Sequence, residues 1–98
     1  MTLSPRFRLA ARREFEEAAS SYEAARKGLG RRFVDAVDET VRLACETPQR
    51  YRFEMSDVQR IRVSHFPYTV YFRARASQLV VLAVFHFRRD PAVWRERA

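Results

Sequence analysis

Two stretches in the first half of the chain carry apolar residues at helical spacing. In the first, the apolar positions recur at steps of four and three along one face: Ala11, Phe15, Ala18, Tyr22 and Ala25. This spacing predicts a helix that begins at Ala10 and ends at the Gly28-Leu29-Gly30 stretch, because glycine tolerates the left-handed backbone found just past helix ends. On its polar side, Glu23 and Lys27 are ordered for an i,i+4 ion pair.

The second stretch predicts a helix from Arg31 to Glu46. Its apolar stripe follows the same steps: Val34, Val37, Val41 and Ala44. Pro48 stops this helix, since the residue before a proline is pushed out of the helical region. With only the glycine-containing turn between them, the two helices are expected to pack as an antiparallel hairpin.

After Pro48 the period drops to two, which is typical of strands. Clean alternation predicts strands at 60–63 and 68–75, and an apolar run at 79–87 predicts a central strand. Short connections make these three strands an antiparallel meander. A short opening strand is expected at 6–9, where polar and apolar residues also alternate. The chain is therefore expected to be a single α+β domain over residues 1–98, ordered β-α-α-β-β-β, with the helical hairpin on one face of the sheet.

The charge of the chain is uneven along its length. It carries 19 basic and 12 acidic residues, for a net charge of +7, and all but Lys27 of the basic residues are arginine. Before Pro48 nine basic residues face eight acidic ones, and after it ten face four. The positive field of the second half favours an anionic partner, either nucleic acid or an acidic polypeptide.

Several classes of protein are disfavoured by the same composition. The longest apolar stretch is about half of a membrane span, and the N-terminal residues have no apolar signal core. The single cysteine, Cys45, excludes an internal disulfide and a thiolate metal cluster. No dinucleotide, phosphate-loop or metalloprotease motif is present, so no cofactor and no metal are expected. We expect a cytoplasmic protein that does not bind membranes.

Arginines and one tyrosine alternate with core residues on the predicted strands. They are expected to project from the sheet face opposite the helices, or to follow the last strand directly: Arg60, Arg62, Tyr71, Arg73, Arg75, Arg88 and Arg89. If the helices leave this face uncovered, the guanidinium groups could hold phosphates. The alternative is an ordinary solvated sheet face, where arginines keep the sheet soluble.

His86 and Trp94 are expected to have structural roles. His86 lies near the end of the central strand, with Val84 and Leu82 expected on its side, which favours a structural histidine over a catalytic one. Trp94, in the short C-terminal tail, is expected to anchor that tail against the domain.

A nuclease site would need a proton acceptor and a proton donor beside the scissile phosphate. Arginine cannot act as the base, because its pKa is above about 12. The candidate catalytic residues are therefore a weak set for acid–base chemistry: Arg60, Arg62, Arg73, His86 and Arg88. Such a set supports anion binding better than cleavage.

Motifs in order along nearly the whole chain resemble the RelE/ParE toxin superfamily. The segments that carry the resemblance are Glu14-Phe15-Glu16-Glu17-Ala18, Tyr22-Glu23, Gly28-Leu29-Gly30, Phe66-Pro67-Tyr68-Thr69-Val70-Tyr71-Phe72 and Arg88-Arg89-Asp90-Pro91 with Trp94. The resemblance implies the toxin of a type II toxin–antitoxin pair, which a cognate antitoxin protein neutralises. RelE-like members cut mRNA on the ribosome, whereas ParE-like members inhibit DNA gyrase.

The chain departs from the RelE-like pattern in two ways. RelE-type sites often use lysines and a tyrosine near the C-terminus, whereas here the comparable positions are arginines and no tyrosine follows Tyr71. The leading hypothesis is therefore a ParE-like gyrase inhibitor. The alternatives are a ribosome-dependent mRNA endonuclease and an inactive relative that acts only in an antitoxin complex. Residues expected to bind the target or the antitoxin are Arg60, Arg62, Tyr71, Arg73, Arg75, Arg88, Arg89 and Trp94.

Overall fold

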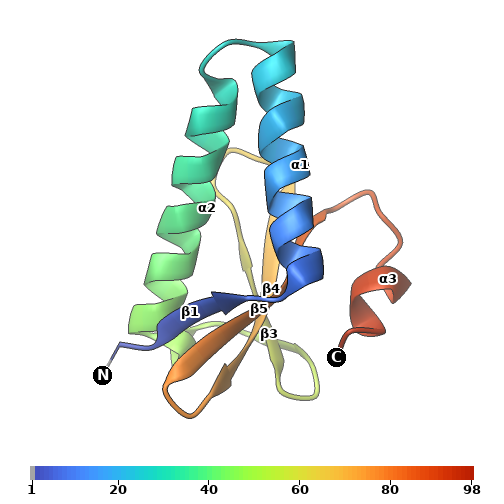
Figure 1. Ribbon diagram of the computed structural model, residues 1–98. Helices are drawn as coiled ribbons and strands as arrows, with labels where there is room; N and C mark the ends of the chain where they lie inside the picture. The colour runs from blue at the N-terminus through green and yellow to red at the C-terminus, as the bar shows by residue number, and fades with distance from the viewer. Residues whose placement is uncertain (1) are drawn as a thin grey trace.

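A helical hairpin packs across one face of a five-stranded sheet (Figure 1). The structure, a computed structural model, describes residues 2–98. Its elements are β1 (Ser4–Phe7), α1 (Leu9–Ala25), α2 (Leu29–Glu46), the 3-10 helix η1 (Pro48–Arg50), β2 (Phe53–Met55), β3 (Val58–Arg62), β4 (Tyr68–Arg75), β5 (Gln78–His86) and α3 (Ala92–Arg95). The predicted α+β class and the order of its main elements are confirmed; β2, η1 and α3 are additions.

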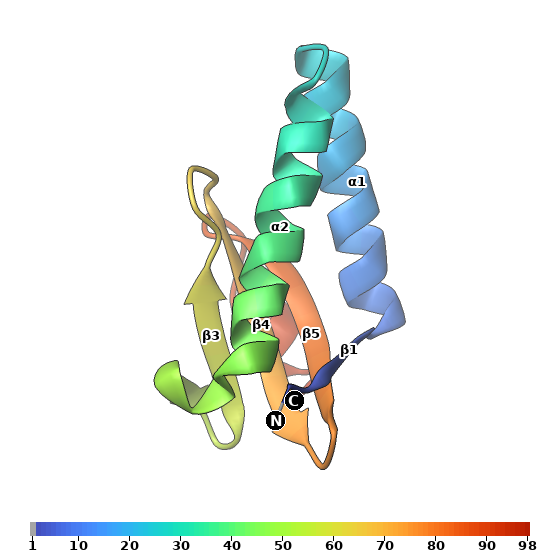
Figure 2. The ribbon, with the colours of Figure 1, turned by 90° about the vertical axis from the view of Figure 1, so that its left-hand side faces the viewer.

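The two long helices lie side by side and their tip projects beyond the sheet (Figure 2). Their apolar stripes meet the sheet in one core, in which Phe15, Phe33 and Val37 pack against Phe72 and Val81. This burial supplies the main stabilisation, because apolar area removed from water contributes about 25 cal/mol per Å². The predicted helical periodicity therefore identified the buried faces.

The turn between the helices differs from the prediction. α2 begins at Leu29, so Gly30 lies inside the helix and only Gly28 has the left-handed φ, of 89°. The expected Glu23–Lys27 pair is replaced by a cap: the Glu23 carboxylate accepts the backbone N–H of Gly28 at 2.9 Å and of Gly30 at 3.0 Å. These N–H groups lie at the start of α2 and have no hydrogen-bond partner within that helix, so the Glu23 side chain of α1 accepts them.

The strands are ordered β1-β5-β4-β3-β2. β2 to β5 pair antiparallel, and β1 pairs parallel with β5 at the edge. The predicted opening strand at 6–9 lies instead at Ser4–Phe7, and Leu9 already starts α1. β1 and β5 can pair in parallel because the helical hairpin and the strands β2 to β4 lie between them along the chain.

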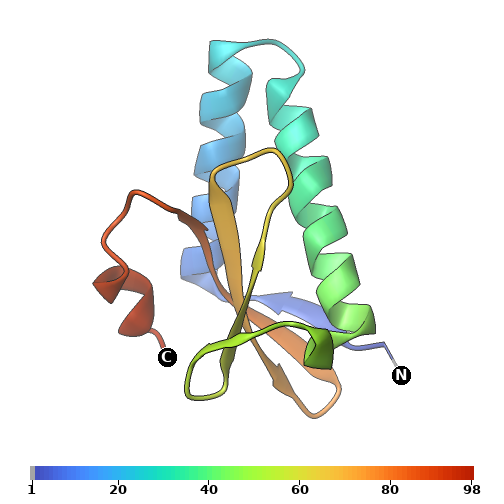
Figure 3. The ribbon, with the colours of Figure 1, turned by 180° about the vertical axis from the view of Figure 1, so that it is seen from behind.

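The face of the sheet away from α1 and α2, here called the far face, is turned toward the viewer in Figure 3. It carries a second, smaller core. Trp94 of α3 is fully buried there and packs with Val58, Leu82, Ala83 and Phe85. The predicted anchoring role of Trp94 is confirmed. The paired helices α1 and α2 leave the far face uncovered, as expected, and α3 covers part of it through Trp94.

Candidate functional site

Strand register places the predicted arginines of β3 and β4 on the far face. Arg60 pairs with Tyr71 and Arg62 with Thr69, and directly opposed residues of neighbouring strands share a face. Arg73 and Arg75 follow Tyr71 at steps of two on the same side of β4. The prediction that these side chains gather on one face is confirmed.

Tyr71 and Trp94 lie beneath the arginines of the far face and are not exposed binding groups. Their rings stack with centroids 4.0 Å apart and planes inclined by 17°. Burial raises the pKa of the Tyr71 hydroxyl above its usual value, with Glu54 adding to the rise. The indole of Trp94 has no solvent-exposed surface, so it cannot itself touch a partner while α3 stays docked.

Carboxylates neutralise several of the far-face arginines. Arg73 directs Nε and Nη2 to Asp57 Oδ1 at 3.2 and 3.0 Å, and Arg75 Nη2 reaches Asp57 Oδ2 at 3.0 Å. Hydrogen bonds from Arg75, and then from Arg73, lower the pKa of Asp57. Arg60 pairs with Glu54 at 2.9 Å. These contacts fix the guanidinium groups in place, but they also reduce the charge that the surface offers.

Arg62 and Arg88 remain exposed, and neither makes an ion pair within residues 2–98. Arg88 donates its backbone N–H to His86 Nδ1 at 3.1 Å, and its guanidinium lies over the ring of Phe87 at 5.7 Å. Of the predicted binding arginines on β3 and after β5, these two are available to an anionic partner without first breaking an ion pair.

His86 lies on the helix side of the sheet, on the face opposite Arg60, Arg62 and Arg73. A β-bulge causes this placement: Tyr71 pairs with Ala83 but Phe72 pairs with Val81, so Leu82 has no partner on β4. The extra residue shifts the alternation of β5 by one. Leu82 therefore packs on the far face and His86 contacts Tyr68 on the helix side, with ring centroids 5.1 Å apart. The expectation that Leu82 shares a side with His86 is wrong.

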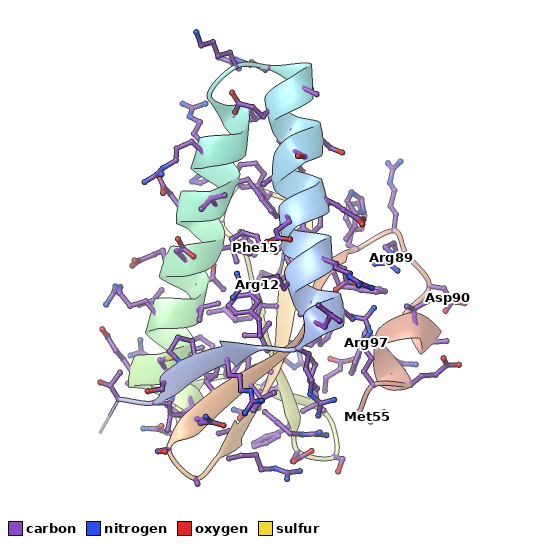
Figure 4. The ribbon with its side chains drawn as sticks, viewed as in Figure 1. Arg12, Phe15, Met55, Arg89, Asp90 and Arg97 are labelled. Carbon is purple, nitrogen blue, oxygen red and sulfur yellow. The ribbon has the colours of Figure 1, made fainter. Side chains whose placement is uncertain are left out.

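Glu14 of α1 holds the C-terminal tail against the open edge of β5. It accepts the backbone N–H of Val84 at 3.1 Å and forms ion pairs with Arg89 at 2.6 Å and Arg97 at 2.9 Å. Arg97 also donates to the carbonyl of Leu82 at 3.1 Å. Figure 4 shows Arg89 and Arg97 converging from the tail on the side of α1 that faces α3. β1 is too short to cover this part of β5, and these side chains replace it.

Two arginines of the far face, Arg6 and Arg8, are not among the residues predicted from the sequence. Arg6 of β1 pairs with Val80 of β5, and Val80 pairs with Arg73 of β4, so Arg6 and Arg73 lie on the same side. Arg8 continues the extended backbone of β1. Together with Arg6, Arg73 and Arg75 it lines a hollow at this edge of the sheet. The alternation of residues 6–9 was visible in the sequence, but the pairing partner of that strand was not.

The far face presents guanidinium groups, whose chemistry suits anion binding better than proton transfer. His86, the one candidate acid–base group among the predicted catalytic residues, lies on the other face from Arg60, Arg62 and Arg73. The carboxyl of Asp57 is engaged by two arginines and its pKa is lowered, which suits it to position those arginines rather than to exchange protons. In the described part of the chain no three His, Cys, Asp or Glu side chains are grouped to hold a metal ion. None of the helices in residues 2–98 has the length and apolar character to cross a membrane.

Comparison with known proteins identifies the family. The family model described as "ParE toxin of type II toxin-antitoxin system, parDE" matches residues 6–91. A solved structure, described as the chromosomal ParDE TA system from P. aeruginosa, contains a chain of the same fold, with a TM-score of 0.75 at 13% identity, covering 87% of this chain and 96% of that chain. A search of curated proteins finds no significant match. The matched family model, which spans most of the sequence, shows that the chain belongs to the family of ParE toxins of type II toxin–antitoxin systems.

Proposed function

We propose that this toxin arrests growth by inhibiting DNA gyrase and that a cognate antitoxin neutralises it. The observation that carries the proposal is the ParE family match over residues 6–91, since ParE-like members of the superfamily act on gyrase. His86 lies on the opposite side of the sheet from the arginines of the far face, which supports gyrase inhibition over mRNA cleavage. Cleavage by the 2′-hydroxyl of RNA needs a base and an acid beside the same phosphate.

A supercoiling assay with purified toxin and gyrase tests the target. We expect the toxin to suppress supercoiling at a modest molar excess. Undiminished supercoiling at a large excess would count against gyrase as the target. Mapping of mRNA ends after induction of the toxin provides the second readout, because only a ribosome-dependent endonuclease generates new ends within translated codons. Induction without the antitoxin separates both activities from an inactive relative, which leaves growth unaffected.

The antitoxin is proposed to bind through an acidic amphipathic segment. A hollow between α2 and the turn that joins β3 to β4 is suited to its apolar side chains, because it is lined by Leu29, Ala36 and Phe66. Arg32 at the same hollow supplies positive charge for a carboxylate at its rim. The exposed arginines of the far face extend the positive surface.

Two charge reversals test where the antitoxin lies. Arg32→Glu changes the rim of the hollow and Arg62→Glu changes the far face, and both side chains are exposed. Calorimetric titration with the antitoxin encoded beside the toxin gene is expected to show at least a tenfold loss of affinity for the reversal that lies under the antitoxin. Arg26→Glu, exposed near the helix-hairpin turn, is the matched control. Unchanged affinity in both variants would place the antitoxin elsewhere.

A further inference from the structure

Four arginines line one groove on the far face, at the edge of the sheet formed by β1. Arg6 and Arg8 border it on one side and Arg73 and Arg75 on the other, and Gln78 and Val80 of β5 form its floor. Arg6 and Arg8 belong to none of the segments that carry the family resemblance. Their position on the far face follows only from the parallel pairing of β1 with β5.

The strand register sets the dimensions of the groove. Arg6, Val80 and Arg73 form one row across three strands, and Ser4, Gln78 and Arg75 form the next. Neighbouring strands lie about 4.8 Å apart, so the two arginine-bearing strands are separated by about 10 Å. Along each strand, alternate residues are about 7 Å apart. The four arginine side chains thus leave the sheet in two parallel rows, with a backbone spacing along each row comparable to that of successive phosphates in one nucleic-acid strand. The shared carboxylate of Asp57 draws the guanidinium groups of Arg73 and Arg75 together.

The groove keeps a strong positive charge despite Asp57. This carboxylate binds both Arg73 and Arg75, and it fixes their orientation. Within residues 2–98, Arg6 and Arg8 make no ion pair, and Arg6, Arg8 and Arg75 are all exposed. One side of the groove therefore has uncompensated charge, while the other is held in place by the carboxylate.

We propose that this groove binds the phosphodiester backbone of a single nucleic-acid strand. Guanidinium forks match phosphate oxygens in a bidentate geometry, and two rows allow the backbone to be held from both sides. The separation of the rows admits one backbone and excludes a duplex. An acidic peptide fits less well, because the apolar lining is confined to Val80 and the neighbouring Phe7 and Leu9. Binding through phosphates alone is independent of base sequence and sensitive to salt. The proposal does not depend on which enzyme the toxin inhibits.

Fluorescence anisotropy with the full-length chain tests the groove. The probe is a labelled single-stranded DNA of mixed sequence, titrated at several salt concentrations in the absence of gyrase. The double variant Arg6→Gln/Arg8→Gln is expected to bind about tenfold more weakly at moderate salt. The slope of log K against log salt is negative, and each lost phosphate contact reduces its magnitude by about 0.7 for single strands. Loss of two contacts should therefore reduce the magnitude by about 1.4. Both side chains are exposed, and circular dichroism verifies that the variant is folded.

The matched control removes the same charge at the helix-hairpin turn. Arg26→Gln/Lys27→Gln lies at the tip that projects beyond the sheet, and both residues are exposed (Figure 2). It is expected to keep the slope and to lose less than about threefold in affinity. Equal weakening by the control would overturn the proposal, because net charge alone would then explain binding. So would equal affinity for a duplex of the same sequence, or tighter binding of a poly-glutamate peptide that also depends on Arg6 and Arg8.

These outcomes are distinct from those that bear on the proposed target. A toxin whose Arg6→Gln/Arg8→Gln variant loses DNA binding but still inhibits supercoiling supports the groove and the gyrase target alike. Absence of DNA binding by the unaltered toxin at low salt overturns the groove, whatever the supercoiling assay gives.

Discussion

The indole of Trp94 stacks on the phenol ring of Tyr71, with ring centroids 4.0 Å apart. This contact joins a four-residue helix near the C-terminus to the centre of the sheet. Together with the ion pairs of Glu14 to Arg89 and Arg97, it holds α3 in place, since so short a helix is not stable by itself. The stacked pair closes the second core on the far face and leaves the arginine groove at the β1 edge open beside it.

Truncation of Trp94 is expected to be among the most destabilising changes in the chain. Trp94→Ala should lower the free energy of unfolding by about 3 kcal/mol, because it leaves a cavity under α3. Trp94→Phe should cost less, since it keeps a stacked ring and removes an indole N–H that is buried without a hydrogen-bond partner. Urea denaturation measures both. Val93→Ala, at a 38% exposed neighbour, serves as the control and should change stability by less than about 0.5 kcal/mol.

Glu14 is expected to contribute more to the free energy of unfolding than an ordinary surface carboxylate does. Its side chain is only 12% exposed and binds Arg89, Arg97 and the N–H of Val84. Glu14→Ala should cost about 2 kcal/mol, because two guanidinium groups and one strand N–H lose their acceptor. Glu14→Gln keeps an acceptor for Val84 and should cost about half as much. Urea denaturation and hydrogen exchange at the Val84 amide report these losses, and the exposed Glu16→Ala is the control. A change no larger than that of Glu16→Ala would contradict the assignment.

The two glycines of the hairpin are required for different reasons. A Cβ at Gly30 would lie 2.6 Å from the carbonyl oxygen of Ala19, so the two helices would have to move apart. Gly30→Ala should therefore cost about 2 kcal/mol through overpacking. Gly28 has open space around it but a φ of 89°, so Gly28→Ala should cost about 1 kcal/mol through backbone strain.

Asparagine distinguishes these two causes. Gly28→Asn should be tolerated better than Gly28→Ala, because asparagine adopts the left-handed conformation more readily. Gly30→Asn should be at least as damaging as Gly30→Ala, because its side chain is larger. Thermal denaturation of the four variants checks the order. An alanine at position 30 that leaves the melting temperature unchanged would show that the helices separate at no cost.

The helices and the main strands could be predicted because their periods depend on local sequence. The apolar stripes through Phe15 and Val37 are buried as expected. β2 was missed because its three residues, Phe53–Met55, are too few to show a period and lie mostly exposed at the sheet edge. The pairing of β1 with β5 was also unpredictable, since strand order is set by packing across the whole hairpin and not by the four residues of β1.

The site was predictable only in part, for a related reason. Alternation correctly placed Arg60 and Arg73 on one face. A strict period of two would also have brought His86 to that face, and the bulge at Leu82 prevents it. A bulge in an apolar run leaves no mark in the sequence, because Leu82 and Ala83 suit either face.

The pair of arginines on Asp57 makes a last prediction, on the dependence of stability on pH. In the unfolded chain an aspartate titrates at about pH 3.9. Hydrogen bonds from Arg75, and then from Arg73, lower the pKa of Asp57 in the folded protein. Below about pH 5 the unfolded chain therefore binds more protons at this site than the folded one. The stabilisation that Asp57 provides is complete above the unfolded pKa and is lost as the pH falls through the folded one.

Urea denaturation of the wild type and of Asp57→Asn across this range measures the effect. The difference in unfolding free energy between them should be constant near neutral pH and should shrink below about pH 4. Arg75→Gln should raise the pKa of Asp57, which NMR titration of its carboxyl group detects. Arg62→Gln changes an exposed arginine of the same face that has no contact with Asp57, so it should leave that titration unchanged. A difference between wild type and Asp57→Asn that is the same at all pH values would show that the carboxylate gains nothing from the two arginines.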